Sequence, residues 1–128
     1  MQYLDASAVV KLAVVEAESD ALGRYLTDDD EWVSSSICFV EAVRNVTPHG
    51  AARASLARHL LDRMRLVSLD DAVLETAGSI GPSTLRSLDA IHIATALTLG
   101  AELDALVTYD RRMQEAAVLL GIPVAAPA

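Results

Sequence analysis

Short apolar segments alternate with helical segments along the whole chain, and this alternation restricts the fold more than any other feature. Five segments have strand character, at 2–5, 32–34, 65–69, 105–109 and 122–125. Apolar residues at helical spacing predict a helix capped by Ser7 and further helices over 20–27, 37–46, 51–64, 72–79, 88–99 and 111–120. Strands that alternate with helices form parallel sheets covered on both faces. We therefore expect an α/β fold, a three-layer α/β/α sandwich, built as a single domain over residues 1–128.

Two of the helical segments carry specific expectations about burial. The segment 51–64 is amphipathic, and the apolar residues expected on its inner face are Leu56, Leu60, Leu61 and Met64. The segment 88–99 is apolar almost all round, which predicts a buried helix.

The composition favours a well-covered core in a reducing compartment. A mean hydropathy of +0.33 is high for 128 residues, and it predicts a covered parallel sheet, a buried oligomer surface, or both. No apolar run reaches the roughly 18 residues of a membrane span, and the first residues lack the features of a secretory signal. The single cysteine, Cys38, cannot form an internal disulfide. We expect a cytoplasmic protein that does not associate with membranes.

Four acidic residues stand where a parallel sheet would bind a ligand. Asp5 ends the first strand and Asp110 follows the strand 105–109, so both face the same crevice if these strands are neighbours. Asp89 begins the apolar helix, and Glu41 lies among apolar residues in the segment 37–46. Each aspartate taken singly has an ordinary alternative as a turn residue or a helix cap. The alternative for Glu41 is an ion pair with Arg44.

A cluster of four carboxylates needs a counter-charge, because mutual repulsion otherwise raises at least one of their pKa values. Ligation by oxygen alone suits a hard cation such as Mg²⁺ or Mn²⁺. Such an ion can lower the pKa of a bound water to make a nucleophile, and it can offset charge on a phosphoryl group. The four acids are therefore candidate catalytic residues and candidate metal ligands.

Four sequence motifs carry a resemblance to a known family. They are Tyr3-Leu-Asp-Ala-Ser-Ala-Val-Val-Lys11, Glu41 in its apolar setting, Leu88-Asp-Ala-Ile-His-Ile-Ala94 and Val107-Thr-Tyr-Asp-Arg111. In this order and at these separations, they resemble PIN-domain nucleases, and among them the VapC-type toxins of bacterial toxin–antitoxin pairs. The resemblance extends over nearly the whole chain. The acidic positions of the family match Asp5, Glu41, Asp89 and Asp110, with none missing.

The resemblance implies a parallel five-stranded sheet and endonucleolytic cleavage of RNA that depends on Mg²⁺ or Mn²⁺. It also implies a homodimer and a cognate VapB-type antitoxin, whose tail occupies the active-site groove. Ser7 and Thr108 match small polar positions of the family, and we expect their hydroxyls to orient Asp5, Asp110 or metal-bound water. For Ser7, the alternative role of capping a helix stays open.

The basic residues and histidines have weaker signals. The net charge of −8 opposes contact with phosphates, although a bound cation would cancel much of the charge of the four acids. All but one of the ten basic residues are arginine, the better partner for phosphate. Arg86, Arg111 and Arg112 lie beside the acids in sequence and are candidate RNA contacts, with ordinary solvated surface as the alternative. His92 lies one turn after Asp89, but a lone histidine on an apolar helix is usually a hydrogen-bonded core residue.

Two other functions remain as alternatives. A phosphatase with Asp5 as its nucleophile would need a second aspartate two residues later and a distant lysine, whereas this chain has Ser7 there and only Lys11. A catalytically idle domain that serves as a protein-interaction module would suit the high hydropathy. The complete set of four acids argues against a catalytically idle domain. Binding of Mn²⁺ would distinguish an intact nuclease site from such a module.

Overall fold

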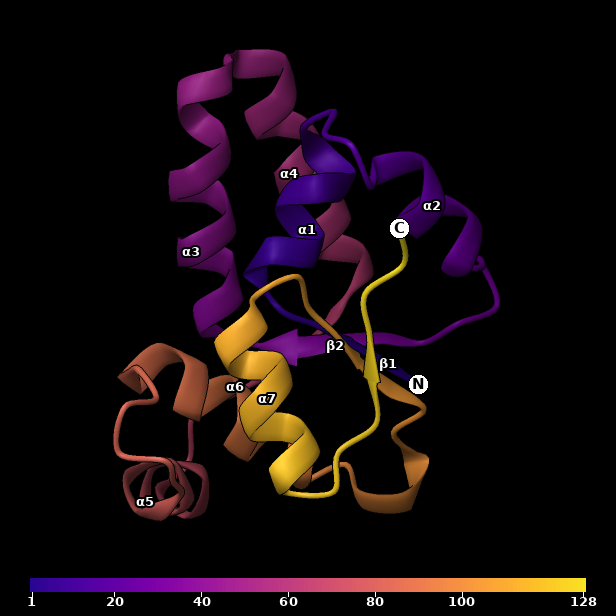
Figure 1. The fold of residues 1–128 in the computed structure, drawn as a ribbon. Coiled ribbons are helices and arrows are strands. Elements are labelled where there is room, and N and C mark those ends of the chain that lie inside the picture. The colour runs from indigo at the N-terminus through magenta and orange to yellow at the C-terminus, as the bar shows by residue number, and fades with distance from the viewer.

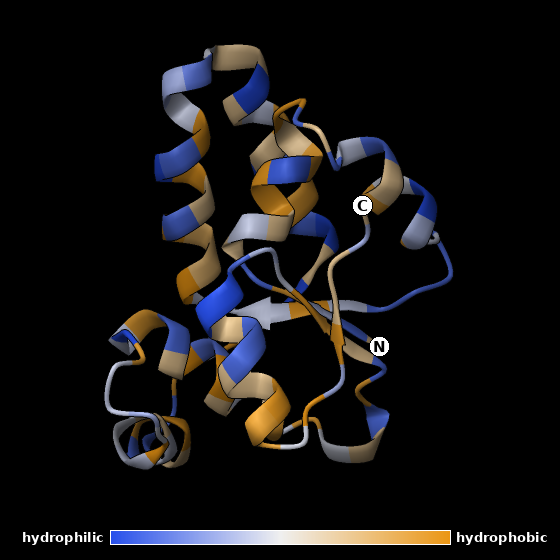
Figure 2. Ribbon diagram, in the orientation of Figure 1, coloured by the Kyte–Doolittle hydropathy of each residue, from blue (hydrophilic) through white to orange (hydrophobic).

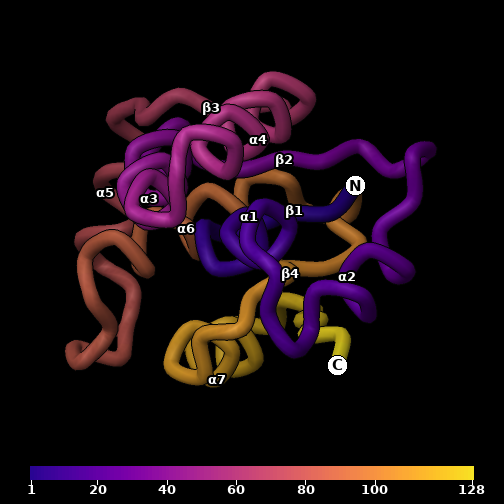
Figure 3. Tube along the Cα trace, turned by 90° about the horizontal axis from the view of Figure 1, so that it is seen from above, coloured from indigo at the N-terminus to yellow at the C-terminus, as the bar shows by residue number.

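The five strands form one parallel sheet at the centre of the molecule, as the alternating pattern predicted. The computed structural model describes residues 1–128. The strands are β1 (Gln2–Leu4), β2 (Trp32–Ser35), β3 (Arg65–Val67), β4 (Ala105–Val107) and β5 (Val124–Ala125). They lie in the order β3-β2-β1-β4-β5, and every pairing is parallel. Figure 3 shows β3, β2, β1 and β4 following one another across the sheet.

Seven α-helices connect the strands, as Figure 1 shows. Their bounds are α1 (Ala6–Ala13), α2 (Ser19–Tyr25), α3 (Ile37–Val46), α4 (Ala51–Arg63), α5 (Asp71–Ser79), α6 (Ser87–Leu97) and α7 (Arg111–Leu119). Two short 3₁₀ turns, at Thr47–His49 and Gly100–Glu102, follow α3 and α6. None of the helices combines the length and apolarity that a membrane crossing requires.

The core has two halves because successive strand residues point to opposite faces of the sheet. Leu4 and Val107 point to the face that α1 to α4 cover, where Val9, Leu22, Ala42 and Leu61 pack. Tyr3 and Leu106 point to the other face, where Ile93 of α6 and Met113 of α7 pack. The helices α5 and α6 also pack against each other. The three-layer α/β/α sandwich is therefore confirmed. In Figure 2, the acidic loop that leads from α2 to β2 is blue and lies outside these layers.

Several details differ from the sequence-based expectations. The strands predicted at 65–69, 105–109 and 122–125 are shorter, and helix α1 is capped by Asp5 rather than by Ser7. Leu56 is 37% exposed because α4 turns Ala57 and Leu61 inward, and the small Ala57 packs closely with Ala13 and Val46.

Exposed apolar residues occur in the apolar segment around Glu41 and in the helix that was expected to be buried. Phe39 and Val40 of α3 are exposed, so the surroundings of Glu41 are less apolar than its sequence neighbours indicated. In α6, Leu88 and Leu97 are exposed while the middle of the helix is buried.

Candidate functional site

The order of the strands places two of the four acids at one edge of the sheet. The chain passes from β1 outward to β2 and β3, and then returns to β4 on the other side of β1. The order therefore reverses between β1 and β4, and ligands of open parallel sheets bind beyond the strand ends at such a point. Asp5 follows β1 directly, and Asp110 follows β4 as the N-cap of α7.

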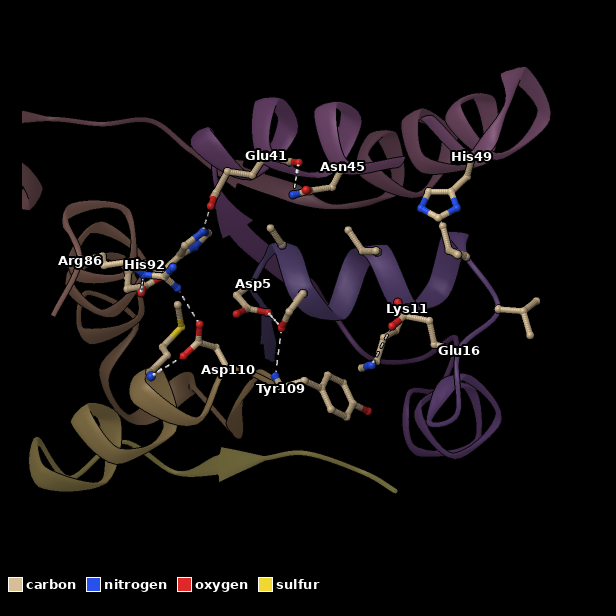
Figure 4. Close-up of a pocket in the computed structure, with 17 residues that line it drawn as sticks. Asp5, Lys11, Glu16, Glu41, Asn45, His49, Arg86, His92, Tyr109 and Asp110 are labelled. Atoms are coloured by element: carbon tan, nitrogen blue, oxygen red, sulfur yellow. Dashed lines mark hydrogen bonds and ion pairs between the residues drawn. The ribbon is translucent and has the colours of Figure 1, made fainter. Parts of the chain in front are cut away.

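Beyond these strand ends lies a pocket of about 730 Å³, which Figure 4 shows in close-up. Its size is within the roughly 300–1,000 Å³ that is usual for ligand pockets. All four predicted acids line it, together with Ser7, Arg86 and His92. The structure thus brings Asp5, Glu41, Asp89 and Asp110 to one place from the ends of two strands and from two helices, α3 and α6.

Asp5 is the most constrained of the four acids. Its side chain is buried and accepts hydrogen bonds from Ser7 Oγ at 2.6 Å, Thr108 Oγ1 at 2.6 Å and the backbone amide of Ala8 at 3.1 Å. Burial raises the pKa of Asp5 above its usual value, and the hydrogen bonds from Ser7 and Thr108 oppose that rise. The carboxylate therefore has a fixed orientation at the end of β1.

The same two hydroxyls also bind the backbone that leads to Asp110. Ser7 Oγ accepts the amide of Tyr109 at 3.0 Å, and Thr108 Oγ1 accepts the amide of Asp110 at 3.1 Å. Oδ1 of Asp110 accepts the amides of Arg112 and Met113 at the start of α7. Ser7 and Thr108 thus connect the two strand-end acids. Asp110 also caps helix α7. The capping role that the sequence offered as an alternative is therefore compatible with its position in the pocket.

Arg86 lies between the other two aspartates of the pocket. Its Nε donates to Asp89 Oδ2 at 3.0 Å and its Nη2 donates to Asp110 Oδ2 at 2.8 Å. The hydrogen bond and charge of Asp89, with the charge of Asp110, raise the pKa of Arg86. From the sequence, Arg86 was a candidate RNA contact, and the structure shows that it is also the counter-charge of two acids. Its side chain is 61% exposed, so it can leave them without disturbing the core.

Glu41 has a partner that sequence analysis did not find. His92 Nε2 lies 2.6 Å from Glu41 Oε1, and Arg44, the partner considered from the sequence, is exposed one turn further along α3. His92 is 1% exposed, as its apolar helix predicted, and its Nδ1 lies 2.7 Å from the hydroxyl of Tyr3. Burial raises the pKa of Tyr3 well above its ordinary range, so this hydroxyl stays protonated. Helical spacing was the sequence signal that could have placed His92 at the site, because His92 follows Asp89 by one turn of the same helix.

The pocket continues away from the acids along α1 and α3. Its other end is lined by Lys11, Glu16 and His49, none of which sequence analysis assigned to the site. Lys11 Nζ pairs with Glu18 Oε2 at 2.8 Å and Glu16 Oε2 at 3.3 Å, so the only lysine does not contact Asp5. Figure 4 shows this end separated from Asp110 and Arg86 by the length of α1.

Two of the predicted RNA contacts lie elsewhere. Arg111 and Arg112 are exposed at the start of α7 and do not line the pocket. Their contact with RNA stays a prediction.

The chemistry of the donors fits a hard divalent cation. Every acid in the pocket offers carboxylate oxygens, and Mg²⁺ is commonly held by one or two carboxylates directly while it keeps several of its waters. In the present arrangement, no three acidic, histidine or cysteine side chains lie close enough together to hold a metal ion. Arg86 occupies one oxygen each of Asp89 and Asp110, so a cation would have to replace its guanidinium there.

The chain is similar in sequence to a known protein family over almost its whole length. The family profile described as the PIN domain matches residues 2–119. Ribonuclease VapC46 of Mycobacterium tuberculosis is 48% identical over 125 residues, which cover 98% of this chain and 96% of that protein. Ribonuclease VapC35 of the same species is 48% identical over 137 aligned residues, which cover 99% of this chain and 97% of that protein.

Solved structures show the same fold at much lower identity. A toxin–antitoxin complex from Klebsiella pneumoniae contains a chain with a TM-score of 0.72 and 18% identity, covering 100% of this chain and 98% of that one. The Mycobacterium tuberculosis toxin VapC20, described as cleaving the sarcin–ricin loop, gives a TM-score of 0.75 and 15% identity over 91% of this chain and 95% of that one. At these identities the likeness concerns the fold alone.

Proposed function

The chain belongs to the PIN-domain family, and from this premise we propose that it is an endoribonuclease, the toxin of a VapC-type toxin–antitoxin pair. The observation that carries the proposal is the convergence of Asp5, Glu41, Asp89 and Asp110 on one pocket at the point where the strand order reverses. The 48% identity with two proteins named ribonucleases, over almost the full length of each, supports RNA as the substrate.

We propose that the four acids hold Mg²⁺ or Mn²⁺ during the reaction. Asp5, Asp89, Asp110 and Glu41 supply the oxygen donors that such a cation prefers. When bound, the cation would lower the pKa of a water and offset the charge on the phosphodiester. Ser7 and Thr108 hold the Asp5 carboxylate in one orientation, so that little reorganisation is needed when the cation arrives.

Arg86 gives the site a cation of its own for binding the phosphate backbone. Its guanidinium lies at the exposed side of the pocket, where it holds Asp89 and Asp110. Once released from these carboxylates, it remains next to the place where a phosphodiester would lie. Planar guanidinium groups bind phosphate oxygens in a bidentate manner. This contact offsets part of the repulsion expected between RNA and a chain with a net charge of −8.

An antitoxin and a second copy of the chain are the proposed partners. The chain in the Klebsiella complex that shares this fold comes from a toxin–antitoxin pair, which supports a VapB-type antitoxin. The pocket extends from the acids along α1 to Lys11 and Glu16, and this elongated shape suits the tail of such a partner. The homodimer that the resemblance implies is tested by light scattering of the purified toxin, for which we expect twice the mass of one chain.

A cleavage assay tests the proposed activity. The protein, purified free of antitoxin, is incubated with structured RNAs in Mg²⁺ or Mn²⁺, with EDTA as the metal-free control. We expect endonucleolytic products only with the divalent cation, and none from the variants Asp110→Ala and Asp89→Asn. Asp62→Asn is the matched control, because Asp62 is exposed on α4 and does not line the pocket. Absence of any cut, or cutting by Asp110→Ala at the wild-type rate, would reject the proposal.

A further inference from the structure

A buried chain of hydrogen bonds connects the sheet to Glu41. The backbone amide of Ser35, at the end of β2, donates to the Tyr3 hydroxyl at 3.1 Å. That hydroxyl lies 2.7 Å from His92 Nδ1, and His92 Nε2 lies 2.6 Å from Glu41 Oε1. The chain therefore joins β2, β1, α6 and α3 in that order. Figure 4 shows its last part, where the His92 ring points at the Glu41 carboxylate.

One arrangement of protons is consistent with every member of this chain. The Ser35 amide can only donate, so the Tyr3 oxygen accepts from it, and the phenolic proton is available to donate to His92 Nδ1. In this arrangement the imidazole carries a proton on Nε2. The Nε2–H group then donates to the Glu41 carboxylate, which can only accept. Every partner in the chain is thus satisfied in one consistent arrangement.

Glu41 depends on this chain more than the other acids depend on their partners. Asp5 and Asp110 accept backbone amides at the starts of α1 and α7, and Asp89 is paired with Arg86. The Glu41 carboxylate has His92 as its one hydrogen-bond partner. Its longer side chain has three rotatable torsions, so without that partner it would sample several orientations around the pocket.

The partner itself is rigid. Tyr3 is 0% exposed and His92 is 1% exposed, and their rings meet edge to face with centroids 5.8 Å apart. His92 also follows Asp89 by one turn of α6, so one helix carries one acid of the pocket and determines the position of another. These contacts fix the imidazole before any cation binds.

We propose that His92, held by Tyr3, is a positioning residue that keeps the Glu41 carboxylate directed into the metal-binding pocket. The inference rests on the proposed function, because it assigns His92 a part in preparing the same site. It gives His92 no contact with the cation or with RNA. Residues that orient a metal ligand typically contribute about 10- to 100-fold to metal affinity.

Two amide variants separate a positioning role from a merely structural one. The side-chain nitrogen of His92→Gln is as many bonds from the backbone as Nε2, so it can still donate to Glu41. His92→Asn has a similar polarity, but its amide ends at the place of Nδ1 and does not reach Glu41. We expect the Mn²⁺ affinity, measured by calorimetry, to fall about 10-fold or more in His92→Asn and to be largely retained in His92→Gln. Thermal unfolding of both variants establishes that they fold.

Additional variants complete the test. Tyr3→Phe removes the hydroxyl that orients the imidazole, and we expect it to weaken Mn²⁺ binding in the same direction as His92→Asn. His59→Asn is the matched control, because His59 is exposed on α4 and should leave the affinity unchanged. Equal affinities of folded His92→Gln and His92→Asn, whether both are normal or both reduced, would overturn the positioning role.

The failure of this inference can be distinguished from failure of the proposed function. If the wild-type protein binds Mn²⁺ but cuts no RNA, the nuclease proposal fails while the comparison of Gln with Asn at position 92 still decides the role of His92. If the wild-type protein cuts RNA and both amide variants bind Mn²⁺ as it does, the nuclease proposal stands and the positioning role is rejected. A wild-type protein that binds no Mn²⁺ rejects the positioning role together with the metal site.

Discussion

Thr108 donates its hydroxyl to Asp5 at 2.6 Å, although 103 residues separate the two in the chain. The contact exists because β1 and β4 are parallel neighbours, with Leu4 opposite Val107, so the residues that follow these strands meet. Thr108 is 0% exposed and its oxygen also accepts the amide of Asp110. One small side chain therefore connects the two strand-end acids of the pocket.

Replacing Thr108 by valine should weaken the site while keeping the shape of the side chain. Thr108→Val leaves a buried oxygen of Asp5 and the amide of Asp110 without a partner. Such a loss costs about 1–3 kcal/mol of folding free energy, and loss of the group that orients a ligand lowers metal affinity by about 10-fold or more. Urea unfolding and Mn²⁺ calorimetry measure the two effects. Thr108→Ser keeps the hydroxyl and should recover most of the stability and of the Mn²⁺ affinity. Thr27→Val is the control, because Thr27 is exposed and lies outside the pocket.

Removal of Arg86 should increase the affinity for Mn²⁺. The guanidinium holds Asp89 and Asp110, so a cation competes with it for their oxygens in the RNA-free protein. Arg86→Ala removes that competitor, and we expect a lower Kd for Mn²⁺ in calorimetry. RNA binding should weaken at the same time, with the slope of log affinity against log salt reduced by about one.

The control for Arg86 is Arg24→Ala, because Arg24 is an exposed arginine of α2 outside the pocket. It should change neither Mn²⁺ affinity nor the salt slope. Unchanged Mn²⁺ affinity in Arg86→Ala would show that the guanidinium does not compete with the cation.

Local patterns in the sequence were sufficient to predict the layers of the fold and the place of two of the four acids. Periodicity distinguished strands from helices, and the parallel arrangement then placed Asp5 and Asp110 beyond adjacent strand ends. Patterns of this kind depend on neighbours within a few residues. The ends of the strands were less predictable, because Thr108 and Tyr109 have strand character but already belong to the turn that presents Asp110.

The partners of the acids were not predictable because they come from distant segments. Glu41 and His92 are 51 residues apart, and Arg86 is 24 residues from Asp110. From the sequence, Arg44 was the alternative ion-pair partner of Glu41, as the nearest cation along the helix, but Arg44 is exposed to solvent. The packing of α6 against the sheet and its neighbouring helices determines the Glu41–His92 and Arg86–Asp110 contacts. No local sequence pattern encodes that packing.

The thiol of Cys38 should be inert in the folded protein. Cys38 is 0% exposed, and burial raises the pKa of its thiol to about 12, so the reactive thiolate is scarce at neutral pH. Modification then requires opening of the structure, and it should be slower than in the denatured chain by about a thousandfold or more. The release of thionitrobenzoate from an aromatic disulfide reagent measures both rates, with the urea-unfolded protein as the reference.

The raised pKa of the Cys38 thiol also predicts how the stability of the protein changes at alkaline pH. A thiol whose pKa is raised on folding keeps its proton in the folded state while the unfolded chain loses it. Its contribution to stability is therefore complete below the ordinary thiol pKa and is lost as the pH rises toward about 12. Cys38→Ala should show a flatter decline in urea-unfolding free energy between pH 9 and pH 11. Equal declines in both proteins would contradict the assigned shift.

A comparison of two leucines of α4 tests which face of this helix is the inner one. Leu61 is 2% exposed and packs with Val9 and Ala42 of the neighbouring helices, whereas Leu56 is 37% exposed. Leu61→Ala should lower the free energy of unfolding by about 2–5 kcal/mol, the cost of a cavity left by a buried leucine. Leu56→Ala removes the same atoms from a half-solvated position and should cost well under half as much. Urea unfolding of both variants, with the m-value as a check on two-state behaviour, decides between this orientation and the one expected from periodicity, for which the two losses would be equal.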